Sequence, residues 1–148
     1  PPYIKSNADH LNIHSFPPRR SSDLAVMPRI KSDLLAHLAA MGRGELNKER
    51  IEIFDHTALT LVMVSGGYPQ EYQIGHEIKG IESFNGETLF HSGTACKEGK
   101  IVTNGGRVMA LTVTESDIIR GRERLYNLVE LIDFKDKYYR RDIGLDLI

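Results

Sequence analysis

The sequence contains a single cysteine, no tryptophan and no long apolar run. One cysteine among 148 residues, Cys96, excludes an intrachain disulfide and any zinc site built from cysteines. No segment approaches the roughly 20 apolar residues of a membrane helix, and no signal-peptide core is present. We therefore expect a cytoplasmic protein with no membrane partner. The formal net charge of -1 also argues against nucleic-acid binding, which usually requires a basic face.

The chain is long enough for one domain with a real core, and its 41% hydrophobic and 26% charged residues are ordinary for a globular protein. Residues 1–24 differ, because they are polar and show neither helix nor strand periodicity. Within them, residues 13–24 resemble the translation of sequencing-adapter DNA. We predict a non-native segment at 1–24 and the folded domain at 25–148. His10 and His14 have no helix pattern around them and are not predicted to bind metal.

Periodicity predicts an α+β domain after residue 24. Residues 25–28 are expected to be extended, because the residue before a proline avoids the α region. A helix is expected at about 32–42, capped by Ser32, with one apolar face, and a second at about 117–132. Strands are expected at 57–64, 88–91, 100–102 and 107–114, the first of them buried on both faces, with a hairpin turn at 97–99. The fold class is thus α+β, a curved, mainly antiparallel sheet with two flanking helices.

Two glycine pairs follow apolar runs and are the strongest candidates for a binding site. One is the loop Gly66-Gly67-Tyr68-Pro69. The other is Thr103-Asn104-Gly105-Gly106-Arg107. Adjacent glycines let backbone N–H groups approach a ligand, and a guanidinium beside them can bind a phosphate or carboxylate. Asn-Gly-Gly between apolar runs is also typical of an ordinary hairpin, so periodicity leaves both interpretations open.

Four further cations are weaker candidates. Arg29 and Lys31 precede the first helix, where they either face solvent or help to hold an anion. Arg140 and Arg141 precede an aspartate, which indicates either a surface ion pair or a ligand cleft. His91 ends a strand expected to be partly buried, and a packing histidine is favoured over a general base.

Four ordered segments carry a family resemblance. They are V-M-V-S-G-G-Y-P at 62–69, L-F-H-S-G-T at 89–94, I-V-T-N-G-G-R-V at 101–108 and Y-Y-R-R-D-I-G at 138–144. In this order and spacing they resemble phosphoribosylamine–glycine ligase, also called glycinamide ribonucleotide synthetase, the ATP-grasp family of purine biosynthesis. Residues 26–35 resemble the segment after that family's metal-binding acidic motif. The resemblance covers residues 25–148.

The resemblance implies an ATP-dependent ligase that joins glycine to 5-phosphoribosylamine with Mg²⁺ or Mn²⁺, releasing ADP and phosphate. This chain would be its C-terminal, barrel-sandwich-like domain, with the last helix of the ATP-grasp core at about 32–42. Both glycine loops would face the substrate, with Arg107 as the main contact. No catalytic or metal-binding residue is expected in the fragment itself. The missing core would be its packing partner.

The sequence departs from the family pattern at several points. Gln70-Glu71 replaces a small, glycine-containing pair, and Cys96 stands near a position where lysine is common. The acidic metal ligands expected before Ala25 are replaced by the adapter-like segment. We therefore expect no tight binding of ATP or metal and no ligase activity from this chain alone. The alternative is a stand-alone, non-catalytic module that binds anions or another protein.

Overall fold

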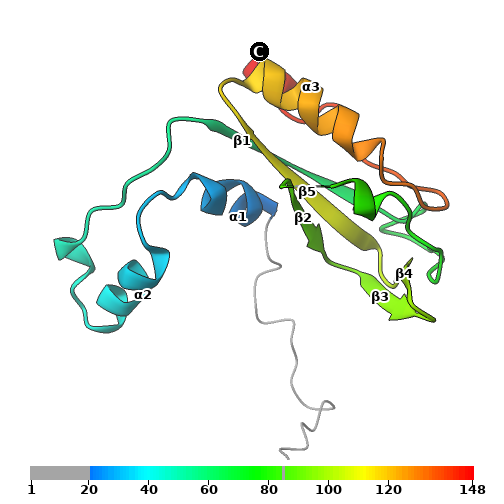
Figure 1. Ribbon diagram of the computed structural model, residues 1–148, viewed down its shortest axis with the longest axis horizontal. Helices are drawn as coiled ribbons and strands as arrows, with labels where there is room; N and C mark the ends of the chain where they lie inside the picture. Colours follow the sequence, from blue (N-terminus) through cyan, green and yellow to red (C-terminus); the bar gives the residue numbers. More distant parts are fainter. Residues whose placement is uncertain (1–20, 85) are drawn as a thin grey trace, which may run out of the picture.

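The computed structural model describes residues 21–84 and 86–148. The predictions for residues 1–20, including His10 and His14, lie outside these residues. The elements run α1 (Ser21–Val26), η2 (Met27–Arg29), α2 (Leu34–Gly42), η3 (Leu46–Lys48), β1 (Thr57–Val64), η4 (Ile81–Ser83), β2 (Thr88–His91), β3 (Thr94–Lys97), β4 (Lys100–Thr103), β5 (Arg107–Glu115), α3 (Ile118–Val129) and η5 (Leu145–Leu147). Figure 1 shows their arrangement.

The α+β prediction is confirmed, with antiparallel sheets that do not close into a barrel. β5 lies between β1 and β2 in a three-stranded sheet, and β3 and β4 form a separate hairpin. Leu59, Leu61 and Met63 of β1 pair with Val113, Leu111 and Met109 of β5. These six side chains are buried on one face of the sheet with Leu125 and Val129 of α3, and together they form the core.

The other face of the sheet is covered differently. Along β1, buried residues alternate with half-buried ones, so the expectation that this strand is buried on both faces is wrong. α1 packs against this strand, and Thr112 Oγ1 donates a hydrogen bond to the Leu24 carbonyl at 3.3 Å. The predicted extended conformation at 25–28 is also wrong, because α1 continues into the 3₁₀ turn of η2.

Both predicted α-helices are present, but the cap and the surroundings of the first differ from the expectation. α2 is capped by Asp33, whose Oδ1 accepts from the amides of Leu35 and Ala36, rather than by Ser32. The apolar side chains of α2 are exposed: Leu34 is 38%, Leu35 73%, Leu38 49% and Met41 57% exposed. α3 begins after Asp117, which accepts from the Arg120 amide at 2.9 Å.

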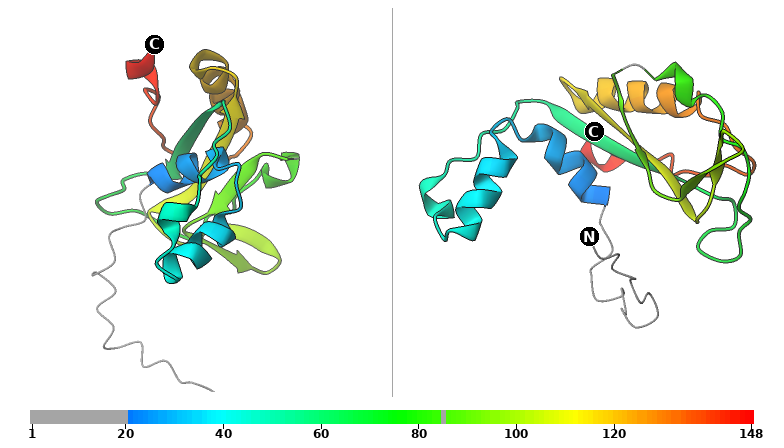
Figure 2. Two further views of the ribbon diagram at one scale, coloured as in Figure 1. Left: turned by 90° about the vertical axis from the view of Figure 1, so that its left-hand side faces the viewer. Right: turned by 60° about the horizontal axis from the view of Figure 1, so that its bottom comes forward.

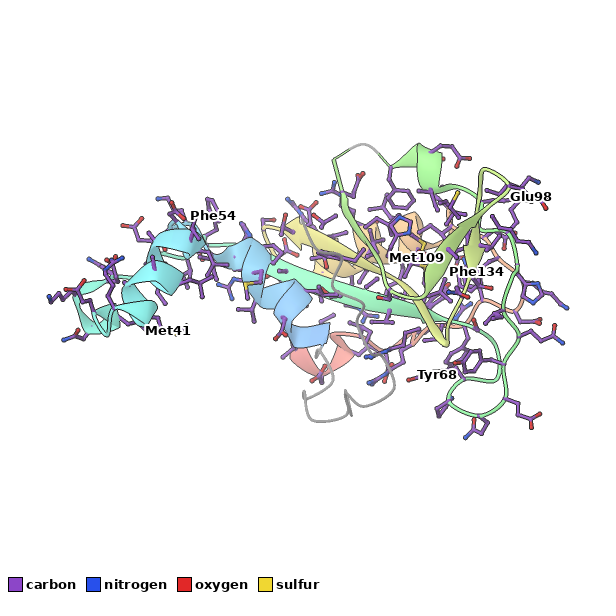
Figure 3. All side chains as sticks on the ribbon, turned by 90° about the horizontal axis from the view of Figure 1, so that it is seen from below. Met41, Phe54, Tyr68, Glu98, Met109 and Phe134 are labelled. Carbon is purple, nitrogen blue, oxygen red and sulfur yellow. The ribbon has the colours of Figure 1, made fainter. Side chains whose placement is uncertain are left out.

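We call residues 34–56 the α2 arm. It projects away from the sheet in the right-hand view of Figure 2. Figure 3 shows Met41 and Phe54 on this arm, far from Met109 and Phe134 of the core. Of the described helices, the longest has 12 residues, and none is long and apolar enough to cross a membrane.

Candidate functional site

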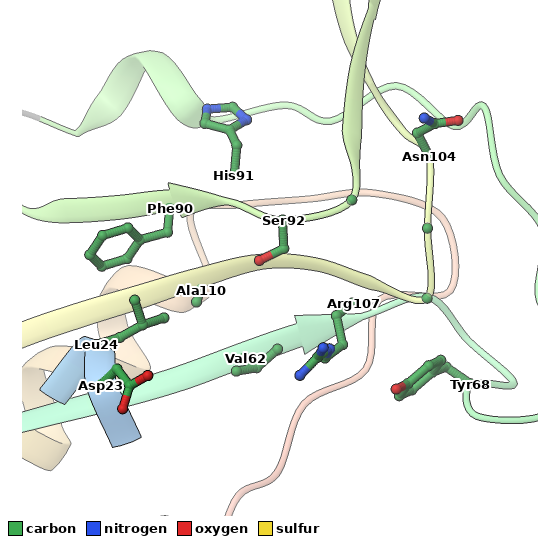
Figure 4. Close-up of a pocket in the computed structure, with 13 residues that line it drawn as sticks. Asp23, Leu24, Val62, Tyr68, Phe90, His91, Ser92, Asn104, Arg107 and Ala110 are labelled. Carbon is green, nitrogen blue, oxygen red and sulfur yellow. The ribbon is translucent and has the colours of Figure 1, made fainter. Parts of the chain in front are cut away.

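A cavity of about 860 Å³ lies on the sheet face opposite α3, and we call it the Arg107 cavity. Its floor comes from alternate strand positions, Val62 of β1, Ala110 of β5 and Phe90 of β2, which the pleat turns away from the core. Asp23 and Leu24 of α1 close one end. Figure 4 shows Arg107 between this end and Tyr68. The remaining lining residues are His91, Ser92, Gly93, Asn104, Gly105 and Gly106.

Five of the nine main candidates from the sequence line this cavity: Tyr68, Asn104, Gly105, Gly106 and Arg107. Gly66 lines a different cavity, and Gly67 and Pro69 line neither. Thr103 is 1% exposed, and its Oγ1 accepts from the His76 amide at 3.1 Å. Its position indicates a structural role in anchoring the loop.

None of the four weaker cations lines the Arg107 cavity. The Arg29 Nη2 donates to the Phe54 carbonyl at 3.5 Å, and Lys31 Nζ lies 3.8 Å from Glu52 Oε2, both at the base of the α2 arm. Arg140 is bound through two nitrogens to Asp142, and these bonds raise its pKa above the ordinary arginine value. Arg141 lies over the Tyr139 ring, 5.6 Å from its centroid.

The two glycine loops are held together as one unit. Ser65, which is 3% exposed, donates from Oγ to the Gly105 carbonyl at 3.0 Å and from its amide to the Gly106 carbonyl at 2.8 Å. The Tyr68 ring lies against Gly106, where a Cβ atom would be 2.0 Å from Tyr68 Cδ2. Glycine at 106 therefore allows the ring and the loop to pack directly.

A third segment, at residues 92–94, joins this unit. The Asn104 amide donates to the Gly93 carbonyl at 2.7 Å. A Cβ atom at Gly93 would lie 2.4 Å from the Arg107 carbonyl oxygen and 2.9 Å from Gly105 Cα. Only glycine permits this approach of two backbones. The three motifs at 65–69, 92–94 and 104–107 thus meet at one end of the sheet.

Among the described residues that line this cavity, Arg107 has the only cationic side chain. Within the described residues, no ion pair or side-chain hydrogen bond of Arg107 is present. By contrast, the Arg124 guanidinium is bound by Glu115 and Glu87, which raise its pKa. An exposed guanidinium with no internal partner beside polar backbone is suited to a carboxylate or phosphate ligand.

Sequence reasoning missed the contributions of Asp23, Leu24, His91 and Ser92. The first two were assigned to the non-native segment, and periodicity gives no signal for the packing of α1. His91 is exposed rather than partly buried, and its Nδ1 lies 2.9 Å from Thr94 Oγ1. The H-S-G-T motif at 91–94, which begins at the last residue of β2, was the available signal for His91 and Ser92. No group of three or more His, Cys, Asp or Glu that could hold a metal occurs in the described part of the chain.

Comparisons with known proteins give one consistent family. The sequence profile for "Phosphoribosylglycinamide synthetase, C domain" matches residues 58–146. The phosphoribosylamine–glycine ligase of Brucella melitensis is 41% identical over 80% of this chain and 29% of its own length. The trifunctional purine biosynthetic protein adenosine-3 of Gallus gallus is 40% identical over 80% of this chain and 12% of its own.

A solved structure supports the same family. The crystal structure of phosphoribosylamine–glycine ligase from Thermotoga maritima aligns with a TM-score of 0.58 and 31% identity, over 72% of this chain and 27% of that one. The chain thus spans under a third of the length of the ligases that it matches.

Proposed function

Because this chain belongs to the phosphoribosylglycinamide synthetase C-domain family, we propose that it is the C-terminal part of a ligase that joins glycine to 5-phosphoribosylamine. The reaction consumes ATP and forms glycinamide ribonucleotide, ADP and phosphate. The observation that carries the proposal is the meeting of three motifs around Arg107, which has no side-chain partner among the described residues.

In this proposal the residues that line the Arg107 cavity form one wall of the active site. The reaction passes through an acyl phosphate. It requires that the reactants be positioned and that the charge of the phosphate be neutralised, and it does not require a protein nucleophile. Arg107 supplies a guanidinium for a phosphate or carboxylate of the substrates. The backbone at Gly105 and Gly106, fixed by Ser65 and Tyr68, holds the position of that guanidinium.

We propose that ATP and its Mg²⁺ or Mn²⁺ are held by the part of the ligase that this chain lacks. The described residues contain no cluster of carboxylates or histidines suited to a metal, so they do not fit that role. Accordingly, we infer that the chain alone has no ligase activity.

The missing core is also the proposed packing partner of the α2 arm. Four more apolar side chains of the arm are exposed in addition to those of α2: Leu46 at 42%, Ile51 at 56%, Ile53 at 60% and Phe54 at 42%. Contiguous exposed apolar side chains indicate an interface. The match covers only 29% of the Brucella melitensis ligase, so more than two thirds of that protein lies outside it. We propose that this remaining part is the partner of the arm.

The test is complementation in trans. The Brucella melitensis ligase, truncated before the segment that matches this chain, is purified and mixed with this chain, and ATP- and glycine-dependent turnover of phosphoribosylamine is measured. We expect no turnover from either piece and turnover from the mixture. Leu35→Ser is expected to weaken the complementation without unfolding the chain, because the side chain is 73% exposed. Turnover by this chain alone would refute the inferred inactivity, and a mixture that neither associates nor turns over would overturn the packing proposal.

A further inference from the structure

A short two-stranded ladder lies at the base of the α2 arm. In this ladder residues 50–54 run antiparallel to residues 29–32, with Ile53 opposite Ile30. The two backbone hydrogen bonds that flank this pair have donor–acceptor distances of 2.9 and 2.8 Å. Figure 1 shows the chain running from here past α2 toward β1. Two strands alone are marginally stable in water, so a further strand would strengthen the ladder.

The outer edge of the ladder is free of hydrogen bonds. Successive residues of an extended chain point their N–H and C=O groups to opposite edges. The groups of Glu52 and Phe54 face the inner edge, where residues 29–32 bind them. Those of Ile51 and Ile53 therefore face outward, and within the described residues they make no hydrogen bond. This edge presents two donors and two acceptors, with a spacing of about 6.6 Å between the two residues.

The side chains along this edge are accessible. Ile51 and Ile53 are each more than half exposed, and in an extended chain they lie on the same face. A cavity of about 430 Å³ lies beside them, and Lys31, Arg50 and Glu52 complete its lining. Lys31 Nζ is 3.8 Å from Glu52 Oε2, whereas Arg50 makes no ion pair with any described residue. The edge thus combines an apolar face with an available guanidinium.

These features specify the chemistry of a partner. An unpaired strand edge with exposed apolar side chains is a template for another strand. An extended peptide offers donors and acceptors at the same spacing, whereas a helix satisfies its own backbone groups. A carboxylate on the incoming strand, across from Arg50, would form a stabilising cross-strand pair.

We propose that a β-strand from the remaining part of the ligase adds to the outer edge of residues 50–54. Its backbone pairs with Ile51 and Ile53, its apolar side chains cover theirs, and an aspartate or glutamate lies across from Arg50. This proposal rests on the proposed function, which assigns that part of the ligase to the α2 arm, and it adds main-chain pairing to the apolar contact. The edge is continuous with the exposed apolar side chains of the arm, so one partner covers both.

The experiment measures hydrogen exchange at single amides in two proteins. One is this chain alone. The other is a chimera that carries residues 29–146 of this chain in place of the matching segment of the Brucella melitensis ligase. In the chain alone, we expect the Ile51 and Ile53 amides to exchange within about tenfold of the rate of an unstructured peptide. In the chimera, we expect both amides to exchange at least about 100-fold more slowly than in the chain alone.

A proline substitution separates main-chain pairing from apolar contact. Ile51→Pro removes one outward N–H and leaves the inner hydrogen bonds in place. In the chimera it is expected to speed exchange of the Ile53 amide by at least about tenfold. Ile51→Val keeps the N–H and a β-branched side chain, so this matched control should change that rate little. In the chain alone, Ile51→Pro should leave the urea midpoint unchanged, because the Ile51 amide has no partner there.

The outcomes separate this proposal from the proposed function. An active chimera whose Ile51 and Ile53 amides exchange as fast as in the chain alone would overturn the strand addition and leave the ligase function standing. A folded chimera without ligase activity would contradict the function, and exchange at the two amides would still decide the strand addition. Slow exchange in the chain alone would also overturn the proposal. If that protection rises with concentration, the occupant of the edge is a second copy of this chain.

Discussion

Gly80 offers a sharp test of how the 66–84 segment packs against the chain that follows α3. It has φ +85°, and a Cβ atom there would lie 1.8 Å from the Leu131 carbonyl oxygen. Beside it, Lys79 and Asp133 form a bridge with amide-to-carbonyl distances of 2.8 and 3.0 Å. This contact fastens the 66–84 segment to the end of α3. Gly80→Ala must therefore displace backbone rather than a flexible side chain.

The expected cost can be worked out against a matched control. Gly99 also has positive φ, +77°, but a Cβ atom there meets nothing within 4 Å. Gly99→Ala should cost only the left-handed backbone penalty, about 1–2 kcal/mol. Gly80→Ala carries the same penalty and also loses the two bridge hydrogen bonds, so its total cost is about 3–4 kcal/mol at roughly 1 kcal/mol per bond.

The assay is urea unfolding followed by far-UV circular dichroism. A loss of stability appears as a lower midpoint with an unchanged slope. The reasoning predicts that Gly80→Ala lowers the free energy of unfolding by about 2 kcal/mol more than Gly99→Ala does. Equal losses for the two variants would refute the close approach of Gly80 to Leu131.

Two further predictions concern α3. Leu125 is fully buried, so Leu125→Ala should destabilise the chain by about 2–5 kcal/mol in the same urea assay. Ile119 is 61% exposed, so Ile119→Ala should change stability by under about 0.5 kcal/mol. The Arg120 amide lowers the pKa of Asp117, so this carboxylate stabilises the fold above the ordinary aspartate pKa of about 3.9 and loses that effect as pH falls through the lowered value. Asp117→Ala should therefore reduce stability at pH 7, and its difference from wild type should shrink at acid pH; a difference that stays constant with pH would contradict this.

Much of the sheet was predictable from the sequence, because local patterns determine strands. The strands at 57–64 and 88–91 were predicted at the bounds that the structure shows. The short strand β3, with the sequence T-A-C-K, was missed because it has neither alternation nor an apolar run. The pairing of β2 with β5 is a long-range choice that periodicity does not specify.

The candidate site was predictable only in part. The glycine pairs and Arg107 stood out by residue type, and the structure brings most of them into one cavity. The burial of Thr103 depends on its hydrogen bonds with the 75–76 segment, which are tertiary. The apolar face of α2 was evident from its spacing, but spacing does not reveal whether another segment covers it.

The central claim is that the motifs around Arg107 form a substrate-facing wall of a ligase. The most direct test is a chimera in which residues 58–146 of this chain replace the matching segment of the Brucella melitensis ligase. Its kcat/KM is then compared with those of Arg107→Ala and of Arg120→Ala, a control at a side chain that is 73% exposed. The account predicts that the chimera is active. Arg107→Ala should lower its kcat/KM by about 30- to 160-fold, which corresponds to the loss of a charged hydrogen bond of about 2–3 kcal/mol, and Arg120→Ala should change it little. A folded, active chimera that keeps its full kcat/KM after Arg107→Ala would contradict the claim.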